Sequence, residues 1–238
     1  MPKKEDSKAE DKPFTIIYED DSVIAVNKAS GIAVIGERWD IHAPRLDLLL
    51  KEELKGRTEN GGMAELFTVH RIDKETSGLV VFAKNSKAHK ELSAAFESRQ
   101  IEKIYIAVIH GRPSWPGGKI TCDLPLTADG NKKHLTIIDK YRGKPCFTSF
   151  SLLFSAGNYS VAEARPETGR THQIRVHMAA VGHPVVGDAR YGTSDRRLGP
   201  GRFFLHAFHL AFDHPVNGSH MELSSALPLD LEEFLRDS

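Results

Sequence analysis

The sequence predicts an α+β fold in which a mixed, largely antiparallel central sheet is flanked by a few helices. Strand-like runs, rich in β-branched and aromatic residues, follow one another along most of the chain. Few of them are separated by a helical segment of the length that a parallel crossover needs. Hydrophobic residues make up 40% of the 238 residues, which is enough for one packed core in a single domain.

Several short segments have the composition expected of strands. The first two are separated by an acidic turn at residues 19–22, which predicts a hairpin. The expected strands are residues 14–18, 23–26, 79–83, 104–109, 135–138, 146–154, 159–164, 203–205 and 208–212.

Helical periodicity is confined to four segments. Leucines recur at near-helical spacing over residues 45–54, and Asn85 can cap a second helix that follows it. A third helix is expected to open at Thr171 and to end at Gly182. Residues 228–235 are expected to form a terminal helix.

Composition and charge narrow the class of protein. Lys and Arg number 32 and so do Asp and Glu, which gives a formal net charge of zero. Between residues 165 and 202, however, seven arginines stand against three acidic residues, and this excess of four allows local phosphate binding. No apolar run approaches the roughly 20 residues that span a bilayer, and the first residues do not resemble an export signal. We therefore expect a cytoplasmic protein with reduced cysteines, in which residues 1–13 are a disordered tail.

The segment from His70 to Lys84 is a polar loop that leads directly into an expected core strand. Catalytic groups commonly lie on loops that rigid elements hold in place. Asp73 lies near two cationic and two hydroxyl-bearing residues, which could keep a carboxylate ionised and oriented. The same residues would also suit an ordinary turn whose side chains cap the backbone. From the residues alone, both interpretations stay open.

The string HRIDKETSGLVVFAK at residues 70–84 resembles the signature of the RluA-type pseudouridine synthases. Its fixed part departs from that signature at Ile72, where the family has leucine, a volume-conserving change. Residues 103–111 are similar to the family's lysine-x-tyrosine-x-alanine strand, and residues 168–192 match the family pattern almost without a break. Weaker matches extend the resemblance over residues 14–235.

This resemblance implies a catalytic site of three residues in a cleft across the sheet. Asp73 would be the nucleophile, or the base that opens a glycal route. Arg175 would pair with Asp73 through its planar, permanently charged guanidinium. Tyr105 would stack on the target base, a contact worth about 1–3 kcal/mol for a base taken out of its stack.

The resemblance also implies substrate-binding residues. Arg71 is expected either to fill the space that the flipped uridine leaves in the RNA or to hold a phosphate. Lys84, Lys87 and Lys103 are expected as further phosphate contacts. The substrate-binding set is Arg71, His70, Thr76, Ile174, Leu205 and Arg170.

The implied reaction isomerises specific uridines in structured ribosomal or transfer RNA, with residues 14–238 as the catalytic domain. Because no atoms are gained or lost, no cofactor is expected. His172 and His177 are five residues apart and lack a third ligand at a recognisable spacing, so no metal site is expected either. The expected partner is an RNA stem-loop rather than a membrane, and the chain is expected to be a monomer.

Two other functions stay open at this point. A catalytically silent RNA-binding protein on the same fold would be favoured by loss of Asp73, Tyr105 or Arg175, but all three are present. A serine hydrolase would use Ser77 with one of the histidines, although no Gly-x-Ser-x-Gly elbow surrounds Ser77. The loops expected to choose the RNA are residues 36–45, 55–62, 114–119 and 193–201.

Overall fold

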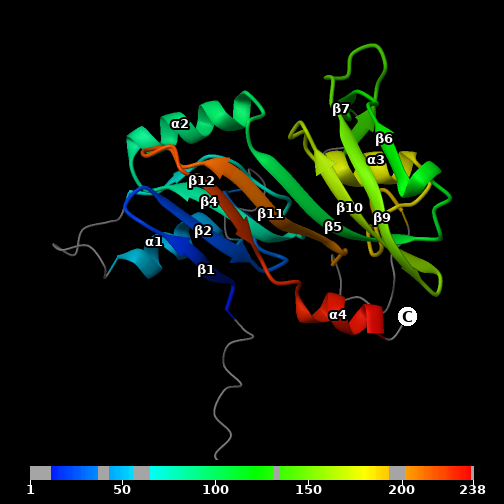
Figure 1. Cartoon of the computed structure of the whole chain (residues 1–238), viewed down its shortest axis with the longest axis horizontal. Helices are drawn as coiled ribbons and strands as arrows, with labels where there is room; N and C mark the ends of the chain where they lie inside the picture. The colour runs from blue at the N-terminus through cyan, green and yellow to red at the C-terminus, as the bar shows by residue number, and fades with distance from the viewer. Residues whose placement is uncertain (1–11, 37–42, 56–64, 131–134, 193–201, 237–238) are drawn as a thin grey trace, which may run out of the picture.

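The computed structural model describes residues 12–36, 43–55, 65–130, 135–192 and 202–236 (Figure 1). The strands are β1 (Phe14–Glu19), β2 (Val23–Lys28), β3 (Phe67–Thr68), β4 (Ser77–Ala83), β5 (Glu102–His110), β6 (Lys119–Cys122), β7 (Leu126–Ala128), β8 (Thr136–Ile138), β9 (Thr148–Ala156), β10 (Tyr159–Pro166), β11 (Leu205–Asp213) and β12 (His220–Ser224). The α-helices are α1 (Leu46–Leu54), α2 (Ser86–Glu97), α3 (Gln173–Ala180) and α4 (Leu229–Arg236).

Ten of these strands form one sheet in the order β1-β2-β4-β11-β5-β10-β9-β6, with β3 beside β4 and β12 beside β11. The pair β4 and β11 is parallel, and the other pairs are antiparallel. A separate hairpin, β7–β8, stands at the end of the molecule that carries β6 and β9 (Figure 1). The predicted class, an α+β fold with a largely antiparallel sheet and a few helices, is confirmed.

Helices cover both faces of β2 and β4, which explains why these strands are continuous apolar runs. Alternate residues of a strand point to opposite faces. Ile24 of β2 accordingly lies in one core cluster with Leu50 of α1. Its neighbour Val23 lies in another cluster, together with Leu92 of α2. The loop of residues 70–76 thus leads into one of the most deeply buried strands of the molecule.

Strand β5 is covered in the same alternating way by the two later helices. Ile109 packs in a cluster with Met178 of α3, whereas Val108 packs in a cluster with Phe234 of α4. Tyr105, near the start of β5, pairs with Ala207 of β11 on one side. The aromatic residue therefore lies near the middle of the sheet.

The short parallel pairing of β4 with β11 requires a glycine at residue 78. Gly78 has φ +110, and a Cβ added there would lie 2.2 Å from the carbonyl oxygen of Ala207. Any larger residue would force the strands apart. This close approach holds the end of the Asp73 loop beside the start of β11, where Ser77 pairs with His206.

Several expected boundaries were wrong. Residues 203–205 and 208–212 are not two strands, because β11 runs through Leu205–Asp213 with a register shift between Ala207 and His209. The third helix begins at Gln173 rather than Thr171, since His172 has φ 55 in the left-handed region. The short strands β3, β6, β7 and β12 were not expected from the sequence.

The expected tail and most of the loops expected to choose the RNA fall largely on residues that the structure does not describe. Residues 1–11 of the expected tail lie outside the described residues, as do most of the loops at 36–45, 55–62 and 193–201. No helix in the described ranges is both long and apolar enough to cross a membrane.

Candidate active site

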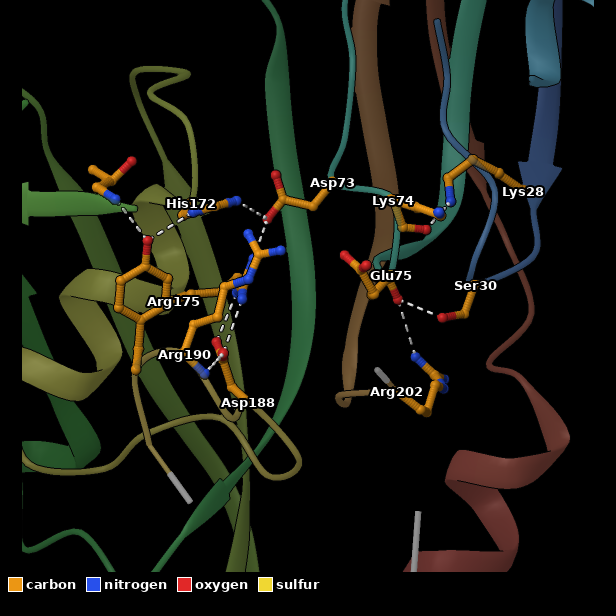
Figure 2. Close-up of polar contacts among 12 residues, drawn as sticks. Lys28, Ser30, Asp73, Lys74, Glu75, His172, Arg175, Asp188, Arg190 and Arg202 are labelled. Carbon is orange, nitrogen blue, oxygen red and sulfur yellow. Dashed lines mark hydrogen bonds and ion pairs between the residues drawn. The ribbon is translucent and has the colours of Figure 1, made fainter. Parts of the chain in front are cut away.

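Asp73 lies on the loop between β3 and β4, and the backbone around it is held by several donors. Its own carbonyl accepts the N–H of Thr76 at 3.1 Å. The carbonyl of Lys74 accepts from the Lys28 ammonium at 3.0 Å and from the N–H of Gly31 at 2.9 Å. Figure 2 shows Lys28 and Lys74 on one side of Asp73. The loop is therefore fixed by hydrogen bonds to its backbone, which leaves the Asp73 carboxylate available on its other side.

The carbonyl of Glu75 is held in a similar way. It accepts from the hydroxyl of Ser30 at 2.6 Å and from Arg202 Nη1 at 3.5 Å. Arg202 also forms an ion pair of 2.7 Å with Asp230 of α4 (Figure 2 shows Arg202 below Glu75). Segments from the beginning and the end of the chain thus meet at the loop that carries Asp73.

The guanidinium of Arg175, on α3, joins two carboxylates. Its Nη1 donates to Asp73 Oδ2 at 3.0 Å, while Nε and Nη2 donate to Asp188 Oδ2 and Oδ1 at 2.6 and 2.8 Å. The Arg175 side chain is only 2% exposed. Burial alone would lower the pKa of Arg175, but the hydrogen bonds and negative charges of Asp188 and Asp73 raise it above its usual value. The pairing of Arg175 with Asp73 was predicted from the sequence, whereas its two hydrogen bonds to Asp188 were not.

Two aromatic rings stack against the guanidinium of Arg175. The Arg175 Cζ lies 4.2 Å from the ring centroid of Phe203 and 5.1 Å from that of Tyr191. The Tyr191 hydroxyl accepts the N–H of Thr136 at 2.9 Å and lies 2.7 Å from His172 Nδ1. A flat, permanently charged guanidinium suits such stacking, whereas a lysine ammonium would not.

His172 stands on the far side of Asp73, with Nε2 4.0 Å from Asp73 Oδ2. Burial lowers the pKa of His172 to about 4, against the opposing effect of Asp73. The ring is therefore neutral at pH 7. A neutral His172 that accepts the Tyr191 proton at Nδ1 carries its own proton on Nε2, facing the carboxylate.

A cavity of about 580 Å³ opens between Asp73, Arg175 and the start of β5. Tyr105 forms part of its wall and is half-buried. Burial and the charge of Asp73 raise the pKa of Tyr105 above its usual value, so the phenol stays protonated at neutral pH. Ile174 and Leu205 supply buried apolar surface to the same cavity. A space of this size with one flat aromatic wall can accept a nucleoside.

All nine residues of the predicted site line this one cavity: Asp73, Tyr105, Arg175, Arg71, His70, Thr76, Ile174, Leu205 and Arg170. They come from segments separated by more than 100 residues, as the ion pair of Asp73 and Arg175 shows. Lys103 lines the cavity too. Lys84 and Lys87 do not belong to the wall, and Lys84 instead forms an ion pair of 2.8 Å with Glu19.

His70 and Thr76 differ in how their polar atoms are occupied. His70 Nε2 accepts the N–H of Val81 at 2.9 Å, and its ring stacks on Phe96 with centroids 4.5 Å apart. Burial lowers the pKa of His70 to about 3, so it is a neutral residue that fixes the loop. The Thr76 hydroxyl, by contrast, is buried and has no hydrogen-bond partner among the described residues. An orphaned hydroxyl at a cavity wall marks a position where a ligand atom could bind.

Ser77 contacts a histidine, but the arrangement does not suit a hydrolase. Its hydroxyl lies 2.9 Å from His206 Nδ1, and His206 Nε2 lies 2.7 Å from the hydroxyl of Ser225 rather than a carboxylate. Ser77 and His206 are 3% and 0% exposed. A serine nucleophile must reach its substrate, so this buried chain of hydrogen bonds connects strands instead.

The described residues contain no group of three or more His, Cys, Asp or Glu side chains placed to hold a metal ion. His172 and His177 point into different surroundings. His177 lies 2.9 Å from the carbonyl of Leu124 and 3.0 Å from the hydroxyl of Thr148. Both histidines are thus engaged in protein hydrogen bonds.

This fold and cavity have counterparts among known proteins. Residues 22–180 match the family model described as RNA pseudouridylate synthase. The ribosomal large subunit pseudouridine synthase D of Zymomonas mobilis is 35% identical over 240 residues, which cover 98% of this chain and 75% of that protein. The dual-specificity RNA pseudouridine synthase RluA of Escherichia coli is 35% identical over 209 residues, which cover 87% of this chain and 90% of that protein.

Solved structures agree with these sequence matches. The human RNA pseudouridylate synthase domain containing 1 superposes with a TM-score of 0.68 at 27% identity, covering 99% of this chain and 98% of the other. The human RNA pseudouridylate synthase domain containing 4 superposes with a TM-score of 0.70 at 24% identity, covering 93% of this chain and 91% of the other, and that likeness concerns the fold.

The fold and these matches together define the chain as an RNA-modifying isomerase. More particularly, the chain belongs to the RNA pseudouridylate synthase family and is a pseudouridine synthase that acts on RNA. Its relatives of the RluA type confirm the resemblance found in the sequence.

Proposed function

We propose that the chain converts specific uridines in structured ribosomal or transfer RNA to pseudouridine, with Asp73 as the group that starts the reaction. The observation that carries this proposal is the ion pair between the Asp73 carboxylate and Arg175 at the wall of the cavity. The relatives named as ribosomal and as dual-specificity enzymes support these two classes of RNA.

The proposed chemistry breaks the bond between C1′ and N1, turns the uracil and joins C5 to C1′. The base gains a proton at N1 and loses the one at C5, so the atoms balance without a cofactor. Asp73 either adds to the substrate as a nucleophile or removes a ribose proton to open a glycal route. Arg175 holds the carboxylate in place at the cavity wall in either case, through the hydrogen bond from its Nη1 to Asp73 Oδ2.

The other cavity residues are proposed to hold the flipped nucleotide. Tyr105 offers the base an aromatic face that replaces part of the stacking lost in the RNA. Ile174 and Leu205 exclude water from the reacting atoms. Arg71, which is exposed at the rim, either fills the gap left in the RNA or binds a phosphate, as Arg170 would.

We also propose that residues 14–238 act as one catalytic domain, as a monomer in the cytoplasm. The ten-stranded sheet, which contains both β1 and β12, supports one domain. Size-exclusion chromatography with light scattering should give a mass near 26.4 kDa. A mass twice that value would contradict the monomer.

Tritium release tests the function directly. RNA labelled at C5 of uridine should lose tritium to water when incubated with the protein, and the modified positions should then be mapped by chemical probing of pseudouridine. Comparison of cellular RNA with and without the gene would identify the target. RNA that binds but releases no tritium would favour the catalytically silent RNA-binding protein instead.

A further inference from the structure

A second cavity, of about 550 Å³, adjoins the catalytic cavity and shares Arg71, Asp73 and Arg170 with it. Its opposite wall is the β7–β8 hairpin together with the turn that follows β8. Charge distinguishes it from the surface as a whole, because six cationic residues line it against the carboxylates of Asp73 and Glu75. The cationic residues are Arg71, Lys74, Arg142, Lys144, Arg170 and Arg190.

This local excess contrasts with the formal net charge of zero for the whole chain. Cations gathered around one cavity produce a strong local potential even when the total charge is balanced. Arg142, Lys144 and Arg190 are exposed at the cavity wall. A polyanion is therefore the ligand that this cavity would attract.

The turn that carries Arg142 and Lys144 is rigidly built. Asp139 Oδ1 accepts the N–H groups of Tyr141 at 2.9 Å and Arg142 at 3.0 Å. A Cβ at Gly143 would lie 2.3 Å from the Asp139 carbonyl, so the turn closes tightly only with glycine there. Lys144 exchanges both backbone hydrogen bonds with Leu126 of β7, at 2.8 and 3.1 Å. The backbone of the two cationic residues is thus fixed, while the Arg142 side chain is 89% exposed and forms an ion pair of 3.4 Å with Asp139.

We propose that this second cavity binds the backbone phosphates of the RNA strand next to the target uridine. The inference rests on the proposed function, because it concerns the RNA strand that continues from a nucleotide bound in the catalytic cavity. A flipped nucleotide stays joined to its neighbours, so the strand leaves past Arg71 and Arg170, which belong to both cavities. Its next phosphates then bind Arg142 and Lys144 on the hairpin side.

Tyr141, which precedes Arg142 on the turn but does not line the cavity, adds a second means of binding single-stranded RNA. Its side chain is 98% exposed on the turn beside Arg142. An exposed ring next to cations provides a platform on which an unpaired base can stack while its phosphate is neutralised. The cavity and the turn beside it therefore suit an unpaired strand rather than a regular duplex.

The experiment measures RNA binding as a function of salt, using a fluorescein-labelled RNA hairpin with a uridine loop as the probe. Arg142→Gln with Lys144→Gln should weaken binding about tenfold and flatten the slope of log K against log salt by about 0.7 for each phosphate that is no longer neutralised. The control is Lys90→Gln with Lys119→Gln, which removes the same charge from exposed lysines that line neither cavity. The control should keep the affinity and slope of the wild type.

Tritium release at saturating RNA separates this inference from the proposed function. The Arg142 and Lys144 double variant should reach the wild-type rate once the RNA is saturating, because the catalytic cavity is intact. If the double variant keeps the wild-type affinity and salt dependence and still releases tritium, the phosphate site is overturned and the proposed function is not. A flattened slope in a protein that releases no tritium from any RNA would support the phosphate site and overturn the proposed function.

Discussion

Arg175 gives two hydrogen bonds to Asp188 and only one to Asp73. The fork of the guanidinium is therefore fixed by a carboxylate that is 1% exposed, while Asp73 remains 19% exposed toward the cavity. A nucleophile needs to be ionised and still free to approach its substrate. The unequal sharing of one arginine suits such a group, since Asp188 fixes the position of the guanidinium and Asp73 keeps one charge-assisted hydrogen bond to it.

Replacing Asp188 by asparagine should therefore affect both stability and catalysis. Loss of one member of a buried ion pair costs about 3–5 kcal/mol in free energy of unfolding, and Asp73 compensates only in part. A displaced guanidinium should also lower kcat about 100-fold. Urea denaturation and single-turnover tritium release measure the two effects, with Asp213→Asn, at a 76% exposed carboxylate, as the control. Unchanged kcat in Asp188→Asn would mean that Asp188 does not position Arg175.

Lysine at position 175 should not replace arginine. An ammonium keeps the charge but cannot bond both carboxylates in the planar, forked geometry or stack between Phe203 and Tyr191. We expect Arg175→Lys to lower kcat about 100-fold or more, with the affinity for RNA nearly unchanged. A variant whose kcat stays within about threefold of the wild type would show that charge alone is sufficient.

The orphaned hydroxyl of Thr76 should have opposite effects on stability and activity. Thr76→Val removes a buried polar atom that lacks a partner among the described residues, so the free energy of unfolding should stay equal or rise by about 1 kcal/mol. If the hydroxyl binds a substrate oxygen, kcat/KM should fall about tenfold, which corresponds to about 1.4 kcal/mol. Thr76→Ser, which keeps the hydroxyl, should restore most of the activity. Equal activity in the valine and serine variants would remove the hydroxyl from substrate binding.

The buried Lys28 should make stability depend on pH. Burial lowers the pKa of Lys28 to about 7, although Glu75 and Asp73 oppose the shift. Between about pH 7 and about pH 10.4 the unfolded chain binds more protons at this position than the folded chain, so stability rises with pH by up to about 5 kcal/mol. Below about pH 7 both states are protonated, and this contribution is constant.

Urea denaturation of the wild type and Lys28→Met at several pH values measures this effect. The difference in free energy of unfolding between wild type and variant should grow in favour of the wild type from pH 7 upward. Lys87→Met, at an exposed lysine, controls for loss of a lysine elsewhere. A difference that stays constant over this pH range would show that Lys28 keeps the same charge in both states.

The sequence anticipated the segments that carry the site better than the contacts within it. The signature at residues 70–84 and the run at 168–192 identified Asp73 and Arg175, because the family pattern preserves residue types at fixed spacing. The role of Asp188 depends on a turn after α3 that brings it back to Arg175, which spacing along the chain does not reveal. The orphaned hydroxyl of Thr76 is likewise a property of the packed cavity.

Fold details were missed for similar physical reasons. The left-handed conformation of His172 delays the start of α3, and few residues other than glycine adopt that conformation. Short strands such as β3, with two residues, form only because β4 offers a partner. The register shift between Ala207 and His209 appears only in the pairing of β11 with β5, so the spacing of residues along β11 does not reveal it.

The central claim is that the Asp73 carboxylate starts the isomerisation, and single-turnover tritium release by Asp73→Asn tests it most directly. The RNA should be saturating, and its binding should be measured in parallel with the Asp213→Asn control. We expect Asp73→Asn to bind RNA with nearly wild-type affinity and to release no measurable tritium from C5 of uridine. Release at a rate close to that of the wild type would contradict this role of Asp73.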